Sequence, residues 1–156
     1  MPIRSHVHRA ALLTFLVSAV ALAATCDISG SVFPPTGDKL AVGTWGGENA
    51  GVIVGDTIAH VHVGCTLGDF RAPVALDADG RFNVSGSYTL RAFPVHIGPP
   101  LPAQFAGRVE NGQLTLAIAV NDTVEKKLVQ IGPVTVTFGR DPRMGPCPIC
   151  RTPGER

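Results

Sequence analysis

The sequence of 156 residues contains little charge and no run of basic residues. Only 16% of its residues are charged, against about 25% in an average soluble domain, and 13 basic residues are balanced by 12 acidic ones. Proteins that bind nucleic acid or anionic membranes need a basic patch to neutralise phosphate groups. The composition therefore argues against both kinds of partner.

The sequence also lacks an apolar segment long enough to span a bilayer as a helix. Its longest apolar run, residues 10–24, has 15 residues, short of the ~20 that a spanning helix needs. The run follows Arg4 and Arg9 and ends in small residues, a pattern that is typical of a secretory signal peptide. We expect residues 1–24 to be removed, and the mature protein to be periplasmic or secreted without a membrane span.

Helical periodicity is absent after residue 26, and alternation of apolar with polar residues takes its place. Alternation of this kind predicts antiparallel strands with one buried and one wet face. The sequence predicts an all-β domain over residues 25–139, most simply a single antiparallel barrel of about eight strands, with a two-sheet sandwich as the alternative. The expected strands are Leu40–Gly46, Ala50–Val54, Thr57–Cys65, Ala72–Leu76, Arg81–Arg91, Ala103–Val109, Gln113–Asn121 and Leu128–Phe138.

Two local signals mark the course of this chain. Asn111 and Gly112 separate two alternating runs and accept the positive φ angles of a tight hairpin. The alternation slips by one residue across Gly132 and Pro133, which predicts a bulge or an edge position there.

The side chains expected to face inward are mid-sized aliphatics and four aromatics, without charge. Such a set fills a narrow barrel and leaves no roomy ligand cavity. They are Val52, Val61, Val63, Val74, Leu76, Phe82, Val84, Tyr88, Leu90, Phe105, Val109, Leu114, Leu116, Ile118, Val120, Val134, Val136 and Phe138.

Four cysteines, Cys26, Cys65, Cys147 and Cys150, remain in the mature chain. An even count in a small exported domain predicts two disulfides, with three pairings open from the residues alone. Thr25 rather than Gly, Ala or Ser precedes Cys26, which disfavours a lipid anchor. The Pro- and Arg-rich residues 140–156 form a tail that we expect the disulfides to hold.

The run of residues from Gly43 to Asn49, with Trp45-Gly46-Gly47 at its centre, resembles the WGG signature of small exported bacterial proteins of no assigned function. The resemblance extends to Cys147. It implies a disulfide between Cys65 and Cys147, because members with only two cysteines keep this pair; Cys26 and Cys150 would then form the second bridge. Members carry histidines where this chain has Asn49 and Leu67.

Histidines offer the chain a candidate metal site. His60 and His62 leave the same face of one strand, and their imidazoles suit copper or zinc, with His96 a further candidate. The neighbouring Cys65, however, belongs to the inward register, so the third ligand would point away. We therefore expect no resident metal or other cofactor, and a periplasmic copper or zinc binder is the alternative function.

The favoured function is a non-catalytic binding or interaction module for another protein or a small ligand; a hydrolase with an unrecognised site is the second alternative. The proline-rich loop before Ala103 carries Phe93, Ile97 and Leu101, which together with Trp45 at the barrel rim form the expected interaction surface. The simplest interpretation of Trp45 itself, flanked by Gly43, Gly46 and Gly47, is a plug at the end of the barrel. The equal alternative for the loop is that it caps the open end of the barrel and buries its apolar side chains.

Overall fold

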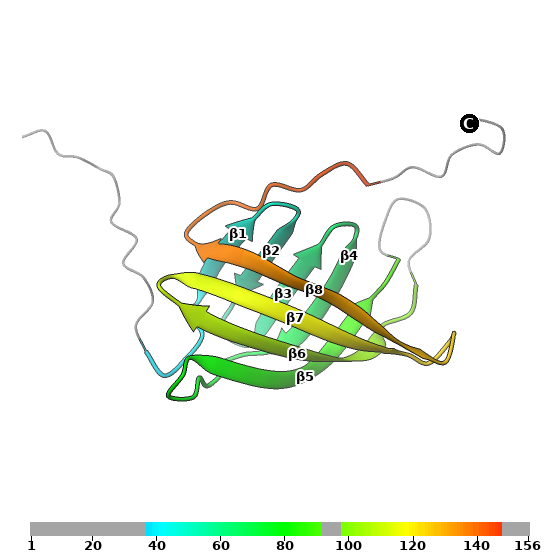
Figure 1. Cartoon of the computed structure of the whole chain (residues 1–156), viewed down its shortest axis with the longest axis horizontal. Helices are drawn as coiled ribbons and strands as arrows, with labels where there is room; N and C mark the ends of the chain where they lie inside the picture. The colour runs from blue at the N-terminus through cyan, green and yellow to red at the C-terminus, as the bar shows by residue number, and fades with distance from the viewer. Residues whose placement is uncertain (1–36, 92–97, 148–156) are drawn as a thin grey trace, which may run out of the picture. The chain divides into compact units, whose positions relative to one another are not determined.

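The computed structural model describes residues 37–91 and 98–147, and every regular element in this part of the chain is a β-strand (Figure 1). No helix in the described residues is long and apolar enough to cross a membrane. The strands are β1 (Gly43–Gly47), β2 (Ala50–Val54), β3 (Ile58–Val63), β4 (Thr66–Arg71), β5 (Arg81–Thr89), β6 (Leu101–Glu110), β7 (Gln113–Asp122) and β8 (Lys127–Phe138).

The eight strands form a closed antiparallel barrel. Each strand pairs with the next along the chain, and β8 returns to pair with β1 through Trp45–Phe138 and Gly46–Thr137. In a closed barrel every strand has a hydrogen-bonded neighbour on both sides, so no edge strand remains. Sequential hairpins with one apolar face favour this closure for that reason. The predicted fold class is confirmed, and the sandwich alternative is wrong.

One predicted strand is in the wrong place. Ala72–Leu76 is not a strand, and the fourth strand is β4, directly after β3. Gly64 has a φ of +57° and allows a two-residue turn, so that Val63 pairs with Thr66. The apolar alternation is hidden in β4 because an inward position is occupied by Gly68. The other seven strands lie where they are predicted, with ends shifted by no more than three residues.

Both local signals are confirmed. Asn111 and Gly112 have φ angles of 51° and 74°, the left-handed values that a tight hairpin requires. In the β7–β8 ladder, Leu116 pairs with Val134 but Ile118 pairs with Ile131, so the register shifts by one residue beside Gly132 and Pro133.

The interior of the barrel is lined as the alternation predicts. Every side chain predicted to face inward is buried or packs against the buried cluster. The prediction missed several core members, which are Leu40, Trp45, Ala50, Val54, Ala59, Phe70, Leu101 and Ala103.

Aromatic rings make a continuous row through this interior. Phe70 lies 6.1 Å from Phe82 and 5.0 Å from Phe105 between ring centroids, and Phe105 lies 6.1 Å from Tyr88. Phe105 and Tyr88 are fully buried. Rings in tilted contact at these distances contribute stability beyond the apolar area they bury.

The segment after β8 is attached to the outside of the β1–β2 hairpin. Arg143 donates its backbone N–H to the Gly47 carbonyl, and Asn49 donates its own to the Arg143 carbonyl. A disulfide joins Cys65 to Cys147, 82 residues apart in sequence. The pairing implied by the WGG resemblance is thus confirmed, whereas Cys26 and Cys150 lie outside the described residues.

Candidate functional site

Trp45 is a core residue and not part of an exposed rim. Its side chain is 0% exposed, its indole N–H donates to the Ala41 carbonyl at 3.1 Å, and its ring meets Phe138 edge-on at 5.0 Å. The next residue, Gly46, faces outward, and a Cβ there would lie 2.2 Å from the Arg140 carbonyl oxygen. The WGG run therefore fills the barrel end with the indole and leaves room for the chain after β8 to cross β1.

Leu101 is likewise buried, at 5% exposure, so its predicted place on a docking surface is also wrong. As the first residue of β6 it faces the barrel interior, like Ala103 and Phe105 further along the strand. The remaining members of the predicted interaction surface, Phe93 and Ile97, lie outside the described residues, and so does His96.

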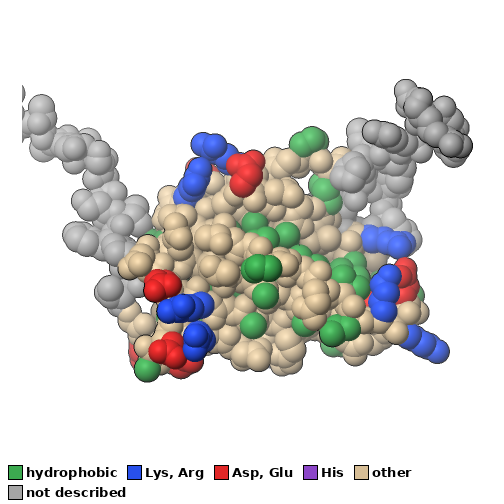
Figure 2. All heavy atoms as spheres, in the orientation of Figure 1, with side chains coloured by type: hydrophobic (Ala, Val, Ile, Leu, Met, Phe, Trp, Pro, Cys, Tyr) green, Lys and Arg blue, Asp and Glu red, His purple; other side chains and the backbone are tan. Residues whose placement is uncertain are grey.

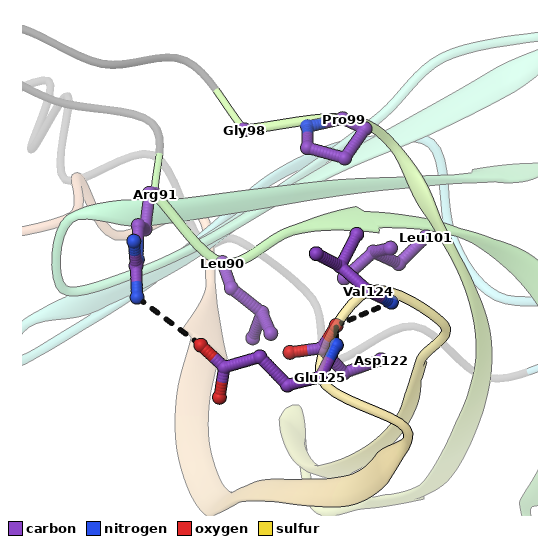
Figure 3. Close-up of a pocket in the computed structure, with 8 residues that line it drawn as sticks. All are labelled: Leu90, Arg91, Gly98, Pro99, Leu101, Asp122, Val124 and Glu125. Atoms are coloured by element: carbon purple, nitrogen blue, oxygen red, sulfur yellow. Dashed lines mark hydrogen bonds and ion pairs between the residues drawn. The ribbon is translucent and has the colours of Figure 1, made fainter.

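A small pocket opens beside Leu101, between the end of β5, the start of β6 and the β7–β8 turn (Figure 3). Leu90 and Leu101 form its apolar floor, and an ion pair between Arg91 and Glu125 at 3.4 Å stands at one side. Its volume of about 140 Å³ is well below the roughly 300–1,000 Å³ of sites that enclose a small molecule. The pocket can take a few atoms but cannot enclose a ligand.

The buried carboxylate of Asp122 shapes the other side of this pocket. Its Oδ1 accepts hydrogen bonds from the backbone N–H groups of Val124 and Glu125, each at 3.0 Å. These contacts fix the β7–β8 turn, from which the Val124 side chain projects with 68% exposure. Asp122 therefore has a structural part in the turn.

His60 and His62 point outward from β3, as predicted, because Ala59 and Val61, which alternate with them, are fully buried. The structure adds a partner that the sequence did not reveal. Asp69 lies directly opposite His60 in the β3–β4 ladder, and its Oδ1 is 2.6 Å from His60 Nδ1. Asp69 is not apparent as a partner from the sequence, because the alternation predicts no strand at β4.

Within the described residues, no group of three or more His, Cys, Asp or Glu side chains could hold a metal ion. The Cys65 sulfur is bonded to Cys147, so it is not a thiolate ligand. Only two imidazoles and one carboxylate therefore come together on β3 and β4.

The outer surface of β5–β8 has no charged side chain across its middle; we call this area the uncharged face. One register row joins Ser85, Gln104, Ala119 and Gln130, and the next joins Asn83, Ala106 and Ala117. On the other side of the first row lie Ser87, Pro102, Asn121 and Leu128, of which Leu128 is 66% exposed. In Figure 2 the acidic and basic side chains gather towards the ends of this face, and its middle shows apolar and uncharged polar atoms.

The uncharged face is slightly hollowed and internally ordered. A depression of about 340 Å³ is lined by residues that include Ser85, Gln104, Ala119 and Leu128. The Gln104 side-chain amide, in the middle of β6, donates a hydrogen bond to Ser85 Oγ at 2.8 Å, and this bond holds the long Gln104 side chain in place. The alanines and serines of this face, together with the fixed Gln104 amide, give a shallow surface that is partly ordered before any partner binds.

Charged side chains at the two ends of this face are arranged differently. At one end Arg81 pairs with Asp79 at 3.0 Å and Arg108 pairs with Glu110 at 3.4 Å. At the other end, Arg91 and Lys127 both contact Glu125, and the exposed Lys126 adds a third positive charge. With Asp122 counted, the second end has three basic against two acidic side chains and keeps a small excess of positive charge. The first end, where Asp77 adds to Asp79 and Glu110, has no such excess.

Comparison with known protein families, with curated proteins and with solved structures finds no match to this chain, so the resemblance to exported WGG proteins stays a prediction.

Proposed function

We propose that this protein is an exported, non-catalytic binding module that holds a partner protein on the uncharged face of its barrel. The observation that carries the proposal is the pair of register rows from Asn83 and Ser85 to Gln130, which contain no ionisable side chain. The cores of protein–protein interfaces are depleted of charge in the same way, whereas an ordinary solvated sheet surface carries Lys, Glu and Asp.

Binding on the outside follows from what fills the inside. The row of rings from Phe82 to Tyr88 and the aliphatic side chains around it occupy the barrel interior. Barrels that bind small molecules internally line their cavity with small residues and a few converging polar groups. Such a lining is incompatible with Phe70 and Phe105 in contact across the interior.

The order of groups across β3, β4 and β5 argues against a serine nucleophile at Ser87. His60 lies opposite Asp69, and Asp69 lies opposite Ser87. A serine nucleophile needs the imidazole at its side and the carboxylate behind the imidazole. Here the carboxylate stands in the middle, so His60 is not beside the hydroxyl that it would have to deprotonate.

The disulfide supports export. A bridge between Cys65 and Cys147 forms in an oxidising compartment, and an N-terminal signal would bring the chain there. N-terminal sequencing of the protein isolated from its own organism should find a chain that begins after residue 24. Recovery of the intact chain from the cytosol would contradict this part of the proposal.

The charges around the uncharged face define the partner. At one end Arg91 and Lys127 contact Glu125 and the exposed Lys126 lies in the same turn, so the partner should present acidic side chains there. Over the middle it should present a flat, uncharged surface, because a charge buried against Ala106 and Ala119 would have no counter-ion. We therefore propose a protein partner with an uncharged patch bordered by acidic residues.

Site-specific photo-cross-linking in the producing organism tests the proposal. Benzoylphenylalanine in place of Ala106 or Ala119 should give a discrete adduct, and the same group in place of Ile53, exposed on β2, should give none. Adding Ala119→Arg to the Ala106 probe should abolish the adduct, because the new charge would be desolvated. Equal adducts from both surfaces, or none from the uncharged face, would overturn the proposal; an adduct of twice the chain's mass would identify a second copy as the partner.

A further inference from the structure

We propose that His60 and His62 bind a divalent transition-metal ion, copper(II) most tightly, and that Asp69 positions His60 for this role. The site lies on β3 and β4 and shares no residue with the uncharged face, although Asp69 pairs with Ser87 at the border of that face. It consists of two imidazole nitrogens on one strand and a carboxylate on the next.

Strand geometry brings the two imidazoles to the same side. His60 and His62 are two residues apart in a regular part of β3, where the buried Ala59 and Val61 establish the alternation. At about 3.3 Å per residue, their Cβ atoms stand roughly 6–7 Å apart. Two imidazole rings that leave a strand at this spacing can lean over one ion and bind it from neighbouring positions.

Asp69 fixes the state of the His60 ring. Its Oδ1 lies 2.6 Å from Nδ1, and an ionised carboxylate can only accept a hydrogen bond, so Nδ1 carries the proton. The other ring nitrogen, Nε2, then has the free lone pair that a metal needs. A carboxylate behind a metal-binding histidine also holds the orientation of the ring.

The neighbouring strands leave the two histidines without a further protein ligand, and His62 is half-buried, since Gly51 lies opposite it on β2 and Pro142 packs against Gly51. Ile53 lies opposite His60 on β2, and Leu67 lies opposite His62 on β4, so neither neighbour in the ladder offers a further ligand. Cys65 is already bonded to Cys147. The ion would complete its coordination with water, as in a site that takes up and releases metal, and not as in a closed structural zinc site.

The preference for copper(II) follows from the ligand type and number. Imidazole binds copper(II) more tightly than it binds the other divalent metals of the first transition series, and copper(II) accepts two nitrogens plus two waters in a square-planar arrangement. Zinc(II) favours a tetrahedron of three or four protein ligands. We therefore expect zinc(II) to bind at the same place but more weakly.

Copper(II) titration of the mature chain, followed by calorimetry and electron paramagnetic resonance, tests the site. We expect one ion per chain with two nitrogen ligands, and loss of this binding in His60→Ala and in His62→Ala. Binding should be unchanged in Asp56→Asn, a control change on the exposed β2–β3 turn. His96→Ala should also leave binding unchanged. Binding that survives the double change of His60 and His62, or that is lost in His96→Ala, would overturn the proposal.

The positioning role of Asp69 has its own test. Asp69→Ala should weaken copper(II) binding by about 10- to 100-fold, the usual effect of removing a partner of a metal-binding histidine. Asp69→Asn keeps an oxygen that can accept from Nδ1 and should weaken binding less. Thermal unfolding of the metal-free variants should be unchanged, because the pair is solvent-exposed. Equal copper(II) affinity in wild type and Asp69→Ala would refute the role.

Discussion

The ring of Tyr88 occupies the space that a side chain at Gly68 would need. The two residues face each other in the β4–β5 ladder, and a Cβ on Gly68 would lie 2.2 Å from Tyr88 Cδ2. The same arrangement recurs in the β5–β6 ladder, where a Cβ on Gly107 would lie 2.4 Å from the ring of Phe82, its direct partner. Glycines inside this barrel therefore make room for cross-strand aromatic rings and so allow the row of rings to form.

Replacing Gly68 with alanine should destabilise the barrel markedly. Tyr88 is fully buried, so its ring has no free space into which it could move. A new Cβ would also lie 2.9 Å from the Ser87 carbonyl oxygen, and moving the ring would not relieve this contact with the backbone. Overpacking of this kind costs about 1–3 kcal/mol. The measurement is the free energy of unfolding in urea. Gly37→Ala is the control, since a Cβ there meets nothing nearer than 3.9 Å; equal stability of the two variants would contradict the packing argument.

Removing the Cys65–Cys147 bridge should lower the free energy of unfolding by about 2–5 kcal/mol, since the bridge closes a loop over most of the barrel. Cys65→Ser combined with Cys147→Ser gives the comparison without leaving one thiol free to form a new pair. The hydrogen bonds of Arg143 with Gly47 and Asn49 remain in this variant, so the chain after β8 keeps part of its attachment. Peptide mapping of the oxidised wild type is the accompanying measurement, and a Cys147–Cys150 bridge would contradict the pairing.

The barrel could be predicted from the sequence because its signals are local. Alternation in β5, β7 and β8 and the Asn111-Gly112 turn each concern neighbouring residues, and antiparallel pairing then links strands in chain order. The bulge beside Gly132 was predicted for the same reason, since it breaks a regular alternation. Closure follows when every strand has one apolar face to bury.

The candidate sites depend on contacts between strands, which alternation does not reveal. In β4 the inward Gly68 removes an apolar residue from the pattern, so Asp69 could not be placed beside His60. Leu101 was expected on a docking loop because it stands among prolines, yet it begins β6 with its side chain inward. Trp45 is fully buried, as the plug that its flanking glycines favour requires, and so is lost from the expected interaction surface. The uncharged face also becomes visible only when four strands are set in register.

The last prediction concerns Tyr88, the single tyrosine of the chain. Burial raises the pKa of its phenol, and the hydrogen bond with Thr66 at 2.6 Å offsets part of that rise. The ultraviolet absorbance of the phenolate should therefore appear at higher pH in the folded protein than in denaturant, where tyrosine titrates near about 10.

This shift determines how stability depends on pH. Below the pKa of Tyr88 in the unfolded chain, both states keep the phenol proton, and the contribution of the buried phenol to stability is complete. Above that pKa the unfolded chain binds fewer protons than the native one. The free energy of unfolding therefore falls as the pH rises through the pKa of Tyr88 in the folded protein. Lys127, whose pKa is raised by its hydrogen bond and charge interaction with Glu125, titrates in the same range. Tyr88→Phe keeps Lys127 and removes only the phenol, so wild type should lose more stability than this variant between neutral and strongly alkaline pH. Parallel curves for the two proteins would show that the Tyr88 hydroxyl is not held neutral by its burial.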